Sequence, residues 1–67
     1  MPKQVELHLP HAPVGDLYAE EAGHRLLFVS TDLRADQTAE LEALRTALAA
    51  LAEKTGAFDN FEIALAD

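Results

Sequence analysis

The segment from Asp36 to Gly56 constrains the fold more than any other part of the chain, because it has the periodicity of one amphipathic helix. Its leucines recur at spacings of three, four and three, as expected for one buried face at about 3.6 residues per turn. These leucines are Leu41, Leu44, Leu48 and Leu51. Alanines fill much of the rest, and Gly56 stands where a left-handed C-terminal cap is expected. Such a helix cannot bury its own leucines, so it requires a sheet or a partner.

Four other segments have the alternation of strands: residues 4–9, 17–20, 25–30 and 61–65. The predicted order is strand, short strand, strand, helix, strand. We therefore expect one α+β domain spanning residues 1–67. It should be a small, mostly antiparallel sheet of three or four strands, with one long helix packed on one face. Strand 25–30, the helix and the last strand should form one crossover.

The ends of these elements also have sequence signals. Pro10 and Pro13 are expected to end the first strand. Asp36 is expected at the N-cap or in the first turn of the helix, where an acid is favourable. In the last strand, we expect Phe61, Ile63 and Leu65 to face the core.

The third strand is apolar on both faces, because Leu26 and Phe28 alternate with Leu27 and Val29. This pattern is typical of an interior strand. One helix can cover only one face of the sheet. We expect Leu27 and Val29 to remain uncovered, together with Tyr18, and to form an interface. A homo-oligomer, most simply a two-fold dimer, would bury that face.

The polar residues give weaker signals. Three of them are candidates for a polar site: His8, His24 and Asp32. His8 and His11 have the spacing H-x-x-H, but residues three apart on a strand point to opposite faces. The chain has no cysteine, and a zinc site needs three or four convergent ligands. We therefore expect no metal and no other cofactor, and we identify no catalytic residue.

The charge balance limits the possible partners. Twelve acidic residues against five basic ones give a formal net charge of −7. Such a chain should be repelled by nucleic acid and by anionic membranes. A basic protein is a possible partner. The sequence also has no long apolar span and no signal peptide, so we expect a cytoplasmic protein.

Three classes of function fit these observations. The first is a small acidic, self-associating protein-interaction module without enzymatic activity. The second is an acidic inhibitor, or an antitoxin-like protein, that neutralises a basic partner. The third is a small oligomeric enzyme with a pocket at a subunit interface. Of the three, the sequence favours the interaction module, because it contains no recognisable catalytic motif.

Overall fold

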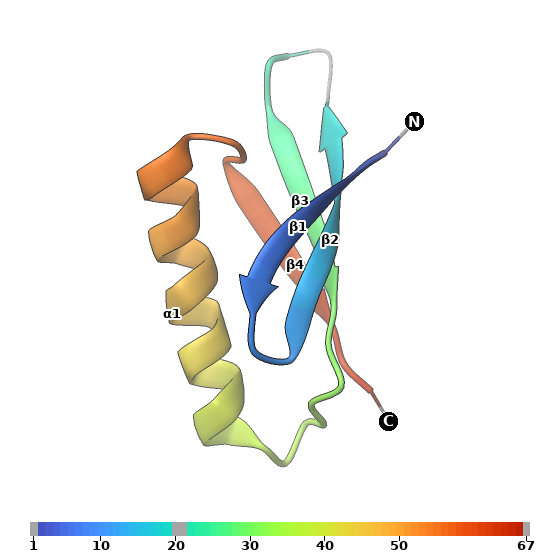
Figure 1. Ribbon diagram of the computed structural model, residues 1–67, viewed down its shortest axis with the longest axis vertical. Coiled ribbons are helices and arrows are strands. Elements are labelled where there is room, and N and C mark those ends of the chain that lie inside the picture. Colours follow the sequence, from blue (N-terminus) through green and yellow to red (C-terminus); the bar gives the residue numbers. More distant parts are fainter. Residues whose placement is uncertain (1, 20–21, 67) are drawn as a thin grey trace.

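The chain folds into a four-stranded sheet with one helix, as the sequence predicts (Figure 1). The computed structural model describes residues 2–19 and 22–66. Its elements, in chain order, are β1 (Lys3–Leu9), β2 (Ala12–Ala19), β3 (Arg25–Ser30), α1 (Thr38–Thr55) and β4 (Asn60–Ala64). The α+β class and the order of elements are therefore confirmed. The predicted strand over residues 17–20 is longer than expected and starts at Ala12, while Glu20 lies outside the described residues.

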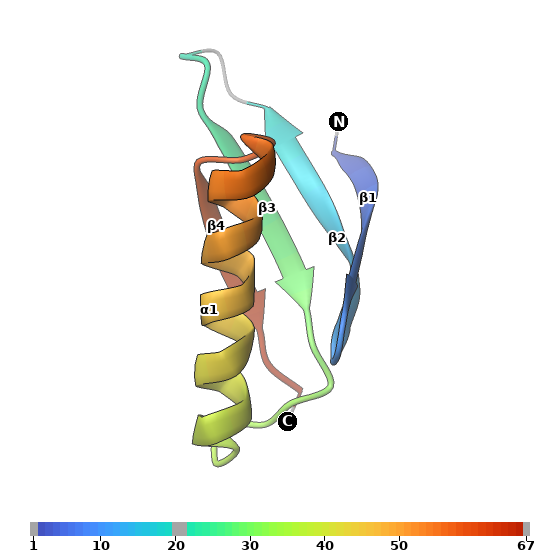
Figure 2. The ribbon, with the colours of Figure 1, turned by 60° about the vertical axis from the view of Figure 1, so that its left-hand side comes forward.

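The strands lie side by side in the order β1-β2-β3-β4. β1 and β2 are antiparallel, as are β2 and β3, whereas β3 and β4 are parallel and joined through α1. The predicted crossover and the interior position of β3 are thus confirmed. Figures 1 and 2 show α1 alongside one face of the sheet, which we call the inner face. The opposite face is called the outer face below.

The core lies between α1 and the inner face. Leu41, Leu44 and Leu48 are buried and Leu51 is half-buried, which confirms the helical stripe. Leu27 and Val29 have 0% exposure and belong to the same core. The expectation that these two side chains face water is therefore wrong.

The register explains this correction. Leu27 lies beside Phe61 of β4, and Val29 lies beside Ile63. Neighbouring residues at the same register point to the same face. Phe61 and Ile63 pack against the core, so Leu27 and Val29 follow them inward. The alternation within β3 alone does not rank its two faces, because both are apolar.

The pairing between β1 and β2 contains a register irregularity. Pairing runs regularly as far as Glu6 and resumes at Leu9, and Pro13 is the residue of β2 opposite this gap. Proline has no N–H to donate, so strands tolerate it at such bulges. Pro13 therefore lies inside β2 rather than ending the first strand. His8 within this irregularity and His11 in the turn after β1 both take positive φ, at 56° and 66°, a backbone region that glycine usually occupies.

The start of α1, the end of α1 and the end of β4 can each be compared with the sequence prediction. Gln37, not Asp36, occupies the N-cap position of α1, and its side chain makes no capping hydrogen bond. Instead, its Oε1 accepts a bond from the backbone N–H of Arg34. Gly56 forms the expected left-handed cap, with φ at 65° and its N–H bonded to the carbonyl of Ala52. Leu65 lies beyond β4 and is 41% exposed, so its predicted place in the core is wrong.

Candidate functional site

The outer face of the sheet displays large apolar side chains. Tyr18 and Phe28 are 41% and 37% exposed, and Leu26 between them is half-buried. Tyr18 stands directly opposite Leu26 on the neighbouring strand. Val14 adds a further exposed apolar side chain on β2. Of the three residues expected at an interface, only Tyr18 therefore lies on an open face, and Leu26 and Phe28 take the places expected for Leu27 and Val29.

Carboxylates surround this apolar centre. Phe28 lies between Asp16 of β2 and Glu62 of β4 at the same level of the sheet. Glu6 of β1 stands opposite Val14 and points to the same face. Among the described residues, none of these three carboxylates forms an ion pair. Asp16 is half-buried, while Glu6 and Glu62 are exposed.

The basic residues of the strands lie elsewhere. Lys3 is paired with Leu17, and Arg25 stands two positions before Leu27 on β3, so both alternate toward the inner side. The remaining basic residues are in the loop before α1 and in α1 itself: Arg34, Arg45 and Lys54. The strand positions of the outer face thus carry negative charge only, within the part of the chain that the structure describes.

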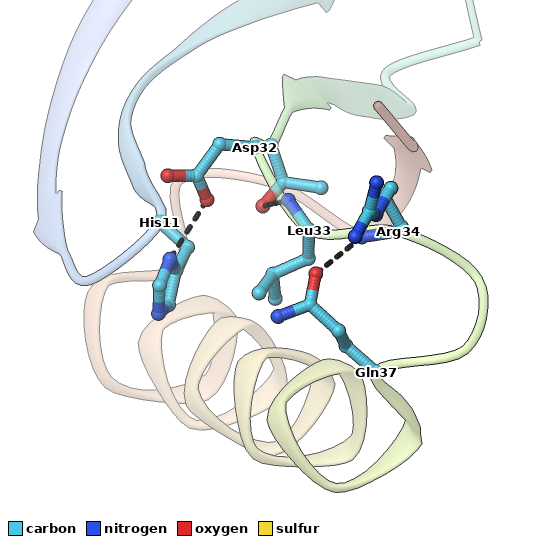
Figure 3. A network of polar contacts seen from close by, with 6 residues as sticks. His11, Asp32, Leu33, Arg34 and Gln37 are labelled. Atoms are coloured by element: carbon cyan, nitrogen blue, oxygen red, sulfur yellow. Dashed lines mark hydrogen bonds and ion pairs between the residues drawn. The ribbon is translucent and has the colours of Figure 1, made fainter. Parts of the chain in front are cut away.

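A second polar feature joins the β1–β2 turn to the loop after β3. His11 Nδ1 donates to Oδ1 of Asp32 at 2.7 Å (Figure 3). In the same loop, the backbone N–H of Leu33 donates to Oγ1 of the buried Thr31. The His11 and Asp32 side chains are 43% and 74% exposed. Water therefore screens the pair, and exposed pairs of this kind contribute about 0–1 kcal/mol.

Ser30 lies near this pair and lines a shallow hollow together with His11 and Asp32. The residue types are those of a serine hydrolase triad, in which a carboxylate orients the imidazole through Nδ1. No hydrogen bond joins Ser30 to His11 among the described residues, however. A catalytic carboxylate is also held in a protected site, whereas Asp32 is largely in water. The arrangement therefore gives little support to covalent catalysis.

The structure does not bring the three candidate polar residues together. His24 directly precedes β3, whereas Asp32 follows its other end, and a six-residue strand is about 20 Å long. His8 lies in the irregular part of β1 and is exposed. Asp32 contacts His11 instead, a residue that the sequence did not place in any site. No local pattern could identify this pair, because its members are 21 positions apart.

A hollow of about 350 Å³ opens between the β1–β2 turn and the first half of α1. It is mostly apolar, and it is lined by Leu9, Pro10, His11, Glu40, Ala43, Leu44 and Ala47. Small-molecule sites are commonly of this size, and a few precisely placed polar groups in them converge on the ligand. Here only His11 and Glu40 are polar. The hollow is therefore a weaker candidate than the outer face.

The described residues offer neither a membrane-spanning helix nor a metal-binding cluster. No helix in residues 2–19 and 22–66 is long and apolar enough to cross a membrane. The same residues contain no cluster of three or more histidine, cysteine, aspartate or glutamate side chains suited to hold a metal ion. Comparison of the chain with family models, curated proteins and solved structures gave no match.

Proposed function

We propose that this chain is a small, acidic, non-enzymatic protein-interaction module that binds through the outer face of its sheet. One observation carries the proposal: Tyr18 and Phe28 are partly exposed on that face, next to Leu26, on adjacent central strands. Exposed single apolar residues are common, but a contiguous apolar patch rimmed by polar residues is typical of a binding site. Aromatic side chains are also enriched among residues that dominate binding energy.

Two occupants fit such a face. A second copy of the chain would give the homodimer that the sequence predicts, and burial of apolar surface would favour it by about 25 cal/mol per Å² before association costs. The alternative is a basic protein, as in an acidic inhibitor or antitoxin-like function. The sequence argument for self-association relied on Leu27 and Val29, which are already buried within one chain. A dimer that forms through the outer face would therefore use Tyr18, Leu26 and Phe28 instead.

Site-specific photo-crosslinking tests the proposal in cells of the source organism. One variant carries p-benzoylphenylalanine in place of Tyr18, and a matched control carries it in place of the exposed helix residue Ala49. We expect a discrete adduct from position 18 and none from position 49. The crosslinked protein, once purified, should bind the wild-type chain directly and bind Phe28→Ser at least several-fold more weakly.

The same experiment can refute the proposal. If irradiation gives no adduct from position 18, or the same adducts from both positions, the outer face is not a specific interaction surface. An adduct of twice the chain mass would show a second copy on the face, and an adduct with another protein would show a heterologous partner.

A further inference from the structure

Building on the proposed function, we infer that the outer face binds a protein segment in which basic side chains, arginines above all, flank an apolar residue. The inference rests on the distribution of charge around the exposed centre. Asp16 and Glu62 stand on either side of Phe28, each on a strand adjacent to β3. Neighbouring strands are about 4.8 Å apart, so the two backbone positions are separated by about 10 Å. Both carboxylates lack an ion-pair partner within the described residues.

Repulsion between like charges disfavours a second copy of the chain on the outer face. Two outer faces packed against each other would bring together three carboxylates from each chain: Glu6, Asp16 and Glu62. Neither face would supply a cation, because Lys3 and Arg25 alternate to the inner side and the other basic residues lie in the loop and α1. Like charges placed against each other in an interface suppress association. The same carboxylates would also repel phosphate groups, which disfavours nucleic acid.

Arginine fits the face better than lysine does. A guanidinium group can bind a carboxylate through two parallel hydrogen bonds and can also stack on an aromatic ring. Phe28 and Tyr18 provide exposed rings, and Asp16 and Glu62 provide carboxylates beside Phe28. A cation over such a ring is attracted by its negative face. Asp16 is half-buried, so an ion pair formed there is less screened than one on an open surface.

A blocked tetrapeptide provides a defined probe. Its first and last residues are arginine, and its two central residues are leucine and phenylalanine. Titration of the ¹⁵N-labelled full chain should give saturable amide shifts in β2, β3 and β4, and the affinity should fall as salt is added. A tetrapeptide with glutamate in place of both arginines should produce no saturable shifts. Shifts confined to α1, or equal responses to both peptides, would overturn the inference.

Charge-matched variants separate specific binding from general attraction to an acidic chain. The double variant Asp16→Asn with Glu62→Gln should weaken arginine-peptide binding at least about tenfold, because two charge-assisted contacts are lost. The control double variant Glu42→Gln with Glu53→Gln makes the same change in net charge at exposed positions of α1. It should retain most of the affinity. Equal weakening by the two double variants would refute a site on the outer face.

Light scattering distinguishes this inference from the proposed function. A monomer mass of 7.3 kDa across micromolar concentrations is expected. A dimer that Phe28→Ser abolishes would contradict the basic partner yet preserve the outer face as an interaction surface. If the chain stays monomeric, binds no arginine peptide and forms no crosslink from position 18, both proposals fail.

Discussion

The two faces of β3 have nearly the same apolar composition and yet entirely different environments. Leu27 and Val29 are sealed beneath α1 with 0% exposure, whereas Phe28, which lies between them in sequence, is 37% exposed on the other side. The inner residues stabilise the fold by contact with the leucines of the helix. The outer residues have no element of the described chain packed over them (Figure 2). The same apolar character thus accompanies burial on one face of β3 and exposure to solvent on the other.

Surrounding charge is the second difference between the faces. Three acidic residues surround the apolar centre of the outer face, while the buried core consists almost wholly of hydrophobic side chains. Thr31 is the buried polar residue among those described, and its hydroxyl accepts a backbone hydrogen bond. Acids beside an uncovered apolar patch keep that surface compatible with water, and under our proposal they would favour partners of opposite charge. The predictions below test this division, beginning with the largest expected effect.

The centre of the inner face should be the most sensitive position. Leu48 has 0% exposure and lies in the middle of the helical stripe. Leu48→Ala should reduce the free energy of unfolding by about 2–5 kcal/mol, because it removes buried surface and leaves a cavity. Leu65→Ala is the matched control, since Leu65 is 41% exposed, and it should change stability by no more than about 0.5 kcal/mol. Urea unfolding of both variants measures the difference. Similar losses would mean that the stripe does not face the core.

Close packing between strands should give the next largest effect. A Cβ on Gly15 would lie 2.9 Å from Cδ1 of Leu27 and 3.3 Å from Cδ1 of Leu7. Both leucines are buried, so Gly15→Ala should destabilise the fold by about 1–3 kcal/mol through overpacking. Leu27→Val creates room at the same place. Thermal unfolding of the double variant should therefore show a smaller loss than the sum of the single variants. Strict additivity would contradict the close approach.

Loss of the contact between His11 and Asp32 should have the smallest effect on the free energy of unfolding. Asp32→Asn removes the charge that faces His11 while keeping the shape of the side chain. Because both partners are exposed, stability should fall by no more than about 1 kcal/mol, and the loss should shrink as salt is added. Urea unfolding at low and high ionic strength gives the comparison. A loss of several kcal/mol that salt does not change would indicate a more protected and more important pair.

Much of the fold could be predicted from periodicity. The spacing of Leu41, Leu44 and Leu48 identified the buried face of α1, and Gly56 identified its end. Alternation identified β3 with its observed bounds. These features could be predicted because each depends on residues close together in sequence.

The features that could not be predicted depend on pairing between distant residues. The face of β3 that α1 covers follows from its register with Phe61 and Ile63. The sequence alone predicts that Pro13 ends a strand, because the bulge that accommodates it forms only when the partner strand is in place. Tyr18 is therefore exposed, as an interface residue must be, whereas Leu27 and Val29 are buried within the chain. His11 and Asp32 carried no shared local signal.

Two single variants test the division between the two faces most directly. Each places a lysine at one of two adjacent positions of β3. In Phe28→Lys, the new cation would stand between Asp16 and Glu62, exposed to water, and the protein should still unfold cooperatively with stability within about 1 kcal/mol of the wild type. In Leu27→Lys, the ammonium group would be buried without a partner at a cost of several kcal/mol, so the chain should be unfolded. Urea unfolding followed by circular dichroism compares the two. A folded Leu27→Lys together with an unfolded Phe28→Lys would show that the faces are reversed, and it would contradict this account.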